Sequence, residues 1–333
     1  GIRSCLLSRG LGDVYKRQQL FGSQNPVTTL KIGTRRSDLA MWQAVFVRDA
    51  LLGAHPDLEV ELVGITTEGD RTLDVPLAAK GGKGLFLKEL EQALLERRID
   101  VAVHSMKDVT VIEPEGLHIP VICERENPCD ALVSAHFSKL EDLPAGAVVG
   151  TCSLRRQAIL RHRFPDLQVE NLRGNVNRRL ARLDAGDFDA IILAAAGLMR
   201  LEMPERIREV IAPEVMLPAV GQGAVGVQCR QNDDETTALL SPLDDPQTHL
   251  RVKAERAVNA ELGGGCHVPI AAYAEIQDEQ LTLRGLVGQP DGSEVLFAEA
   301  TGPSSSPEVV GRTAAQDLLS QGAKRILQSV ADG

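Results

Sequence analysis

The alternation of short apolar strands with amphipathic helices constrains this fold more than any other feature of the sequence. Residues 29–33 alternate as a strand, Ser37 is a favourable N-cap for a helix to about Leu52, and residues 58–65 alternate again. Gly53 is placed to end that helix. Strand, helix and strand in this order predict an α/β unit with parallel strand pairing.

The alternation continues over the next hundred residues. Strands are expected at residues 99–103, 131–134, 148–151 and 189–195, with helices over about 86–97, from Ser153 onward and up to about Gly186. The glycine-rich stretch 217–224 indicates a crossing back toward the first unit. We therefore expect two α/β lobes with a cleft between them.

The C-terminal part has a different pattern. A helix over residues 246–261 precedes three alternating strands, with a turn at Asp291-Gly292, and a last helix is expected over about 307–330. This predicts a small α+β domain with an antiparallel sheet. The expected domains are residues 29–123 with 224–241 returning, residues 124–223, and residues 242–333; residues 1–28, which lack the apolar core of a signal peptide, are expected to be disordered or extraneous.

Composition excludes several classes of function. The 333 residues are 43% hydrophobic and 25% charged, as in ordinary globular proteins, and no apolar run reaches the roughly 18–20 residues of a membrane span. The net charge of −10 argues against general binding to nucleic acid or to an anionic membrane. The six scattered cysteines contain no close zinc pair, so we expect free thiols in a reducing cytoplasm and no metal.

Arginines gather where this acidic chain begins two of its helices. Arg155 and Arg156 follow Ser153 in the first turn of a helix, where the positive end of the helix dipole disfavours them unless an anion is present. Between Leu154 and Arg182 there are eight arginines and two acidic residues. Arginine favours bidentate recognition of carboxylate or phosphate. The alternatives are a solvated basic face or an RNA patch, although the stretch has only one aromatic residue for base stacking.

Three further places carry candidate chemistry. The loop at residues 80–86 could present glycine N–H groups and Lys83 to an anion, or it could be an ordinary surface loop. Asp108 follows a buried strand, where α/β proteins gather ligands, although an isolated aspartate is more often part of a turn. Cys266 follows three glycines and precedes His267, which could favour the reactive thiolate; the alternative is a small buried thiol.

Six short motifs occur in an order that resembles one family. They are Gly33-Thr34-Arg35, Gly81-Gly82-Lys83-Gly84-Leu85-Phe86, His104-Ser105-Met106-Lys107-Asp108, Ser153-Leu154-Arg155-Arg156, Leu172-Arg173-Gly174-Asn175 and Gly264-Gly265-Cys266. From about residue 29 to the C-terminus the chain is similar to the porphobilinogen deaminase (hydroxymethylbilane synthase) family. A non-enzymatic, two-lobed anion-binding protein is the alternative, but it gives no reason for the Cys266 loop or for Asp108.

The resemblance implies a fold and a reaction. It implies two lobes like those of type-II periplasmic binding proteins, and a third domain that carries the cofactor. The family's transferases condense four porphobilinogen molecules head to tail, with loss of ammonia, to give hydroxymethylbilane for tetrapyrrole (haem) synthesis. The chain grows on one covalent dipyrromethane per protein, and the motif match assigns its thioether to Cys266. A cytoplasmic monomer is implied, with porphobilinogen and the growing pyrrole chain as its only partners.

The resemblance also implies residue roles. Asp108 matches the catalytic aspartate, whose carboxylate stabilises the cation left by ammonia and handles the pyrrole proton. The implied cofactor ligands are Lys83, Ser153, Arg155, Arg156 and Arg173, and the implied substrate ligands are Arg35, Ser37, Phe86, Arg179 and Arg200. Arg178 and Arg182 are left as surface or supporting residues. The chain departs from common family forms at Ala79-Lys80, at Cys152 for serine and at His267 for glutamine.

Overall fold

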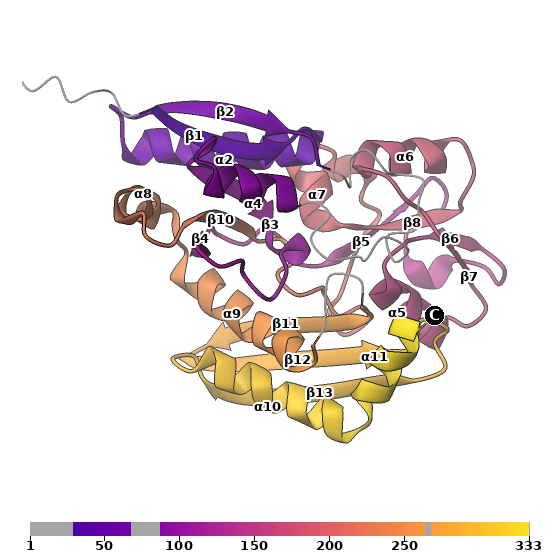
Figure 1. Ribbon diagram of the computed structural model, residues 1–333. Helices are drawn as coiled ribbons and strands as arrows, with labels where there is room; N and C mark the ends of the chain where they lie inside the picture. Colours follow the sequence, from indigo (N-terminus) through magenta and orange to yellow (C-terminus); the bar gives the residue numbers. More distant parts are fainter. Residues whose placement is uncertain (1–28, 68–86, 264–267, 333) are drawn as a thin grey trace, which may run out of the picture.

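Three β-sheets with their helices make up the computed structural model, which describes residues 29–67, 87–263 and 268–332 (Figure 1). The first sheet has the strand order β2-β1-β3-β10-β4. Its strands are β1 (Thr29–Arg35), β2 (Glu59–Ile65), β3 (Val101–Ser105), β4 (Leu117–Ile122) and β10 (Val225–Arg230). Helix α2 (Asp38–Ala54) packs on the face that carries Val101 and Val103, and α4 (Lys88–Leu95) packs on the face that carries Ala102. The short α8 (Asp234–Leu240) follows β10.

The second sheet repeats this arrangement with the order β7-β6-β8-β5-β9. Its strands are β5 (Asp130–Ser134), β6 (Val148–Gly150), β7 (Gln168–Glu170), β8 (Ala190–Ala194) and β9 (Glu209–Ile211). Helix α5 (Leu154–Arg163) packs on one face, while α6 (Val176–Asp184) and α7 (Ala195–Arg200) pack on the other. Because successive strand residues point to opposite faces, strands buried on both sides are apolar throughout.

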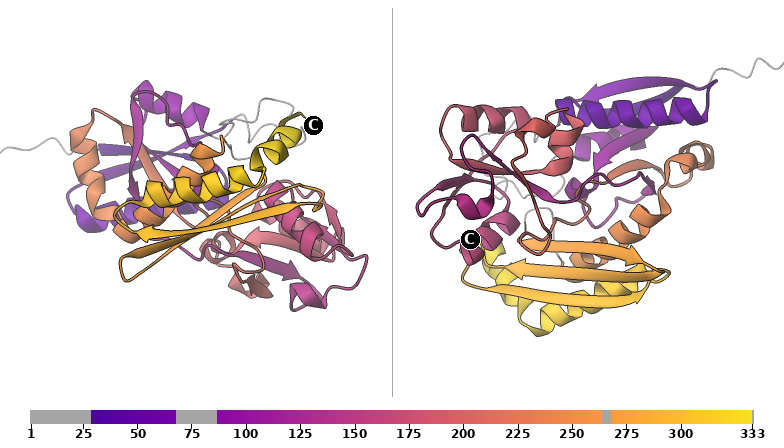
Figure 2. Two further views of the ribbon diagram at one scale, coloured as in Figure 1. Left: turned by 90° about the horizontal axis from the view of Figure 1, so that it is seen from below. Right: turned by 180° about the vertical axis from the view of Figure 1, so that it is seen from behind.

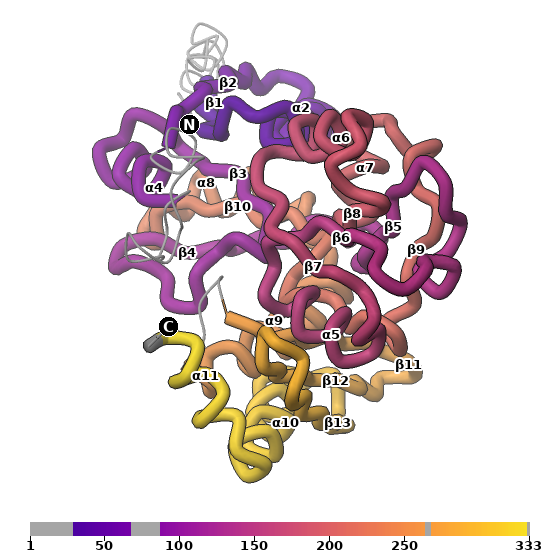
Figure 3. The backbone as a smooth tube through the Cα atoms, turned by 90° about the vertical axis from the view of Figure 1, so that its right-hand side faces the viewer, coloured from indigo at the N-terminus to yellow at the C-terminus, as the bar shows by residue number. Residues whose placement is uncertain are grey.

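The third sheet is antiparallel, with the order β11-β12-β13 (Figure 2). Its elements are α9 (Pro246–Glu261), β11 (Ile270–Gln277), β12 (Gln280–Gly288), β13 (Val295–Pro303), α10 (Pro307–Ser320) and α11 (Ala323–Asp332). The three helices cover one face. On the other face, Ala271 and Leu286 share an apolar cluster with Ile159 of α5, which lies beside this sheet (Figure 3). These three sheets and their helices confirm the predicted fold class, which is two α/β lobes and a small α+β domain.

The structure corrects several expected details. Both five-stranded sheets are mixed, because β10 runs antiparallel to β3 and β4, and β5 runs antiparallel to β8 and β9. Helix α2 continues through Gly53, and the N–H of its C-cap, His55, bonds to the carbonyl of Leu51. The expected last helix is two helices, because Gly322 has a φ of +106°, a left-handed conformation that ends a helix.

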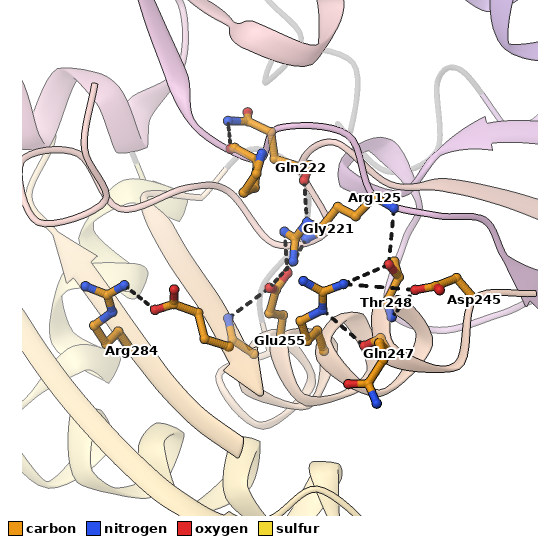
Figure 4. Close-up of polar contacts among 12 residues, drawn as sticks. Arg125, Gly221, Gln222, Asp245, Gln247, Thr248, Glu255 and Arg284 are labelled. Carbon is orange, nitrogen blue, oxygen red and sulfur yellow. Dashed lines mark hydrogen bonds and ion pairs between the residues drawn. The ribbon is translucent and has the colours of Figure 1, made fainter. Parts of the chain in front are cut away.

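A buried ion pair joins the first lobe, helix α9 and the third sheet (Figure 4). Arg125, which follows β4, and Glu255 of α9 are bonded at two points, Nη1–Oε1 at 2.6 Å and Nη2–Oε2 at 3.1 Å. Glu255 also accepts from the backbone N–H groups of Gly221 (2.7 Å) and Ala274 (3.0 Å). Arg125 Nε donates to the carbonyl oxygen of Gln222 at 2.8 Å. The pair therefore fixes α9 against the first sheet, the segment before β10 and strand β11.

Breaking this pair while keeping its shape tests its contribution to stability. Glu255→Gln leaves the guanidinium of Arg125 buried without a counter-charge, and we expect the free energy of unfolding to fall by about 3–5 kcal/mol. Chemical denaturation measures it. Glu308→Gln is the control, because Glu308 forms an exposed pair with Lys253 and should cost less than about 1 kcal/mol. Equal losses in the two variants would contradict the prediction.

Candidate functional site

The turn that carries Asp108 is held tightly at the end of β3. Strand β3 ends at Ser105, and the short 3-10 helix η2 (Met106–Asp108) follows. The N–H of Met106 donates to the carbonyl of Ala224 at 3.0 Å, and the Met106 side chain is buried. A Cβ at Gly221 would lie 2.8 Å from Cβ of Met106, so the turn can pack this closely only against glycine. The position of Asp108 is therefore fixed by the segment that leads into β10.

His104, in the strand that precedes this turn, is neutral near pH 7. Its side chain is buried, with Nε2 3.0 Å from Oε1 of Gln228. Burial lowers the pKa of His104 to about 4; the Gln228 bond and the charge of Asp108 oppose the shift, whereas the charge of Arg35 adds to it. His104 therefore lies within electrostatic range of both Asp108 and Arg35.

Lys107, beside Asp108, stands among charges from both five-stranded sheets. Loss of water around the ammonium is the main cause that lowers the pKa of Lys107. The charge of Asp108 opposes this shift, those of Arg156 and Arg179 add to it, and that of Asp130 opposes it. The Asp108 turn of the first lobe thus meets the arginines of the second.

Asp130, the first residue of β5, holds both arginines of the α5 start. Its carboxylate accepts from Arg155 Nη1 at 2.7 Å and from Arg156 Nη2 and Nε at 2.7 and 3.1 Å. Gln222 Nε2 donates to it at 2.9 Å. Burial raises the pKa of Asp130, but the two guanidinium groups outweigh burial and hold the pKa well below its usual range. The anion that the start of α5 requires is therefore supplied partly by the protein itself.

Among the described residues, the Nε–H of Arg155 has no hydrogen-bond partner, although Nη1 of Arg155 and the guanidinium group of Arg156 are bonded. Arg155 Nη1 also donates to the carbonyl of Leu217 at 2.7 Å, and Arg156 Nη1 donates to that of Ile192 at 2.8 Å. Nε of Arg155 is buried and has no hydrogen-bond partner within the described part of the chain. A buried donor without a partner costs free energy and marks a place that an acceptor can fill.

Arg179 of α6 adds a third guanidinium. Its Nε donates to the carbonyl of Gly174 at 2.8 Å, and Nη2 lies 3.6 Å from Sγ of Cys152. Burial lowers the pKa of Arg179; the charges of Cys152 and Asp108 oppose the shift, while those of Arg156 and Arg173 add to it. Arg173 is partly exposed. Arg179 and Arg173 therefore belong to the same cluster as Asp108.

The remaining described candidates come from the end of β1, the N-cap of α2 and the end of α7. Arg35 is the last residue of β1, and Ser37 caps α2, its Oγ accepting from the N–H of Ala40 at 3.4 Å. Arg200 is buried; its Nη2 donates to the carbonyl of Gly223 at 2.6 Å, and its guanidinium carbon lies 5.5 Å from the centre of the Trp42 ring. Burial lowers the pKa of Arg200, against the charge of Glu126.

Several other residues named from the sequence either lie outside the described residues or are exposed on α6. Cys266, Lys83 and Phe86 lie outside the described residues, as do Ala79, Lys80 and His267. Arg178 and Arg182 are exposed, and Arg182 Nε bonds to Asp187 at 2.7 Å.

The sequence analysis did not single out Lys107 and Asp130. Lys107 had a signal, since it lies with Asp108 just after the carboxyl end of a strand and within the same motif. Asp130 had none that could be recognised locally, because its three partners are 25, 26 and 92 residues away.

The described ranges contain neither a candidate metal site nor a candidate membrane-spanning helix. No three His, Cys, Asp or Glu side chains of those ranges come together in a way that could hold a metal ion. Among the same residues, none of the helices has the length and apolar character needed to cross a bilayer.

The fold and this cluster define a class of protein. Guanidinium and ammonium groups outnumber carboxylates where the two lobes meet. The side chains come from the carboxyl ends of β1 and β3 and from the starts of β5, α5 and α6. Such a centre suits a ligand with several carboxylate or phosphate groups. The protein is therefore of the class that has two α/β lobes and a cluster of cationic side chains between them.

Comparison with known sequences identifies the family. Residues 30–238 match the family model described as "Porphobilinogen deaminase, dipyromethane cofactor binding domain", and residues 249–320 match "Porphobilinogen deaminase, C-terminal domain". The chain belongs to the porphobilinogen deaminase family. It contains the domain that binds the dipyrromethane cofactor, which confirms the predicted cofactor.

Solved structures with a similar chain path include several binding proteins. A nutrient binding protein from Burkholderia cenocepacia bound to methionine is 14% identical, with 64% of this chain and 90% of that chain covered and a TM-score of 0.40. The periplasmic aliphatic sulphonate binding protein from Escherichia coli is 16% identical, with 70% of each chain covered and a TM-score of 0.39. The L-cystine solute receptor of Neisseria gonorrhoeae is 15% identical, with 66% of this chain and 86% of that chain covered and a TM-score of 0.37. These TM-scores are below 0.5, so the family assignment depends on the sequence models alone.

The buried histidine makes a testable contribution to pH dependence. The pKa of His104 is about 4 in the folded chain and about 6.5 in the unfolded chain, so the unfolded chain binds more protons between these values. Stability therefore falls as pH drops from about 6.5 to about 4, by up to about 3 kcal/mol from this group. Urea unfolding at pH 7, 5.5 and 4.5 measures the loss.

His104→Gln removes the titrating group but keeps a partner for Gln228, so its stability should fall less over this range than that of the wild type. The exposed His136, changed to Gln, is the control and should keep the pH dependence of the wild type. An unchanged pH dependence in His104→Gln would show that the histidine does not contribute.

Proposed function

We propose that this chain is a transferase of the hydroxymethylbilane synthase type. It condenses four porphobilinogen molecules head to tail, releases ammonia at each step and forms hydroxymethylbilane for tetrapyrrole (haem) synthesis. The observation that supports this most is the position of Asp108 inside a cluster of cationic side chains, in a chain that has the family's cofactor-binding domain. We further propose a cytoplasmic monomer, a setting that suits the free thiols found among the described residues, which are Cys123, Cys129, Cys152 and Cys229.

The residues present fit the dipyrromethane cofactor. Each of its pyrrole rings carries an acetate and a propionate, which are acceptors only, and the centre offers donors. The buried Nε of Arg155, which has no partner among the described residues, is the clearest place for such an acceptor. We assign the cofactor to Cys266 by a thioether and to Lys83, Ser153, Arg155, Arg156 and Arg173. When bound, it supplies the pyrrole carbon from which the product chain grows.

Asp108 has the central chemical role in this proposal. Its carboxylate stabilises the positive charge that develops as a substrate loses ammonia, and one of its oxygens accepts the proton that the pyrrole carbon must lose. The turn around Met106 keeps that carboxylate in place, so little reorganisation is needed as charge develops.

The incoming substrate is assigned to a second set of residues. They are Arg35, Ser37, Phe86, Arg179 and Arg200. Arg35 and Arg179 have charges that reach Asp108 or its neighbour His104, which supports their assignment. Arg200 uses one guanidinium N–H for Gly223 and has four others to offer. The domains proposed for this function keep the boundaries 29–123 with 224–241, 124–223 and 242–333.

Mass spectrometry of the intact protein, with peptide mapping, tests the function. The expected result is a mass excess of two linked pyrrole units on the peptide that contains Cys266, and ammonia release on addition of porphobilinogen. A bare cysteine would call for incubation with porphobilinogen. If the cysteine stayed bare and no ammonia appeared, the enzyme proposal would fail and a non-enzymatic anion-binding protein would replace it.

Removing the charge of Asp108 tests its role. Asp108→Asn should fold and carry the primer, yet lose roughly 100-fold or more in turnover, because an amide neither accepts the proton nor stabilises the cation. Ammonia release measures turnover. The exposed Asp57, changed to Asn, is the matched control and should keep wild-type turnover. Near-normal turnover in Asp108→Asn would rule out the proposed role.

Exchanging Arg155 for lysine tests the donor that has no partner. Arg155→Lys keeps the charge but removes Nε–H, and hydrogen bonds to charged groups are worth about 1.5–3 kcal/mol, so we expect turnover to fall roughly tenfold or more. The primed fraction of Cys266, measured by mass, should fall as well. Arg178→Lys, an exposed arginine of α6, is the control. Full priming and full turnover in Arg155→Lys would contradict the assignment.

A further inference from the structure

Arg256 of α9 holds the segment that immediately follows Asp108. Its Nη2 donates to the carbonyl oxygens of Thr110 at 2.9 Å and Val111 at 3.2 Å, and Nη1 lies 3.5 Å from the carbonyl oxygen of Val109. Three successive carbonyls thus face one guanidinium. The carbonyls belong to the lobe of Asp108, whereas the guanidinium comes from the helix that leads into the third sheet.

The chemistry of this contact suits arginine in particular. A guanidinium spreads five N–H donors over one plane, whereas an ammonium holds three donors at one point, so arginine reaches carbonyls spread along a loop better than lysine does. The Arg256 side chain is 14% exposed, and its Nη2 also lies 3.8 Å from Oε1 of Glu113. Its hydrogen bonds to the backbone are therefore mostly shielded from water.

Asp108 lies between two anchors. On the N-terminal side, the N–H of Met106 bonds to Ala224, and the Met106 side chain packs against Gly221, before β10, and Gly226, within β10. On the C-terminal side, Val109 shares an apolar cluster with Val252 of α9, and Arg256 binds the carbonyls that follow. A loop fixed on both sides of a carboxylate has little freedom to displace it.

Helix α9 is itself fixed. Glu255, the residue before Arg256, forms the buried pair with Arg125 and accepts from two backbone N–H groups. The helix ends at Glu261, five residues before Cys266 in the sequence. One helix therefore contacts the Asp108 segment and ends a short way before Cys266 in the sequence.

We propose that Arg256 is a positioning residue for Asp108, a role that rests on the proposed function. It acts through the backbone of residues 109–111 and keeps the Asp108 carboxylate in a fixed position relative to helix α9. It touches neither substrate nor cofactor in this role. Its loss therefore lowers kcat, leaves KM unchanged and leaves the primer attached.

Two variants of Arg256 and a control on the same helix test this. Arg256→Gln should lower kcat roughly 10- to 100-fold, the range expected when a catalytic group is misplaced by about 1 Å. KM should stay within about twofold and the primed fraction of Cys266 should equal that of the wild type. Arg256→Lys should give an intermediate kcat. Lys253→Gln also removes one positive charge from α9, but from an exposed pair with Glu308, and should behave as the wild type.

The readouts separate this role from a general loss of structure. A kcat for Arg256→Gln within twofold of the wild type would overturn the inference, as would a loss explained entirely by unprimed protein or by a raised KM. If Arg256→Gln does not fold, Arg256→Lys decides by the same criteria, and an unchanged kcat overturns the inference. A wild-type protein that releases no ammonia would instead overturn the proposed function, and the inference with it.

Discussion

Gln222 joins the two buried charge clusters on which the arrangement of the molecule depends. Its backbone carbonyl accepts from Arg125, which pairs with Glu255, and its side-chain amide donates to Asp130, which pairs with the arginines of α5. Buried charges are costly unless every partner is in place. The observed placement of the three sheets satisfies both clusters, so polar bonds contribute to how these sheets with ordinary apolar cores meet.

The backbone around Gln222 shows what this constraint requires. Gly221 and Gly223 have φ values of +67° and +87°, a left-handed conformation that suits glycine. A Cβ on Gly223 would also lie 3.2 Å from the carbonyl oxygen of Asn127. The same segment supplies the carbonyl that binds Arg200 and the space in which Met106 packs. The local backbone, the joint between the sheets and the placement of Asp108 thus depend on one Gly-Gln-Gly sequence.

Local sequence patterns predicted those parts of the molecule that local forces determine. The cap at Ser37, the alternating strands and the arginines at the start of α5 are of this kind. The break at Gly322 had the usual signal, a glycine at a helix end, but it lay inside a longer apolar pattern. Asp130 could not be assigned to Arg155 and Arg156, because nothing in a short stretch shows which distant carboxylate a buried arginine will meet. The sequence indicated that an anion was needed, and the fold showed that one already belongs to the chain.

The internal anion also explains why the centre remains cationic. Asp130 cannot balance both Arg155 and Arg156, and Lys107, Arg173 and Arg179 add further positive charge. Charges placed this close in partly dry surroundings repel one another, so the folded chain without a ligand keeps an unfavourable electrostatic term. A ligand that carries carboxylates removes that term and satisfies the buried Nε of Arg155 as well. By linkage, such a ligand stabilises the folded state, since the unfolded chain has no such cluster. On the proposed assignment of the dipyrromethane cofactor to these arginines, its carboxylates therefore have a stabilising effect on the folded chain beside the chemical role of the cofactor.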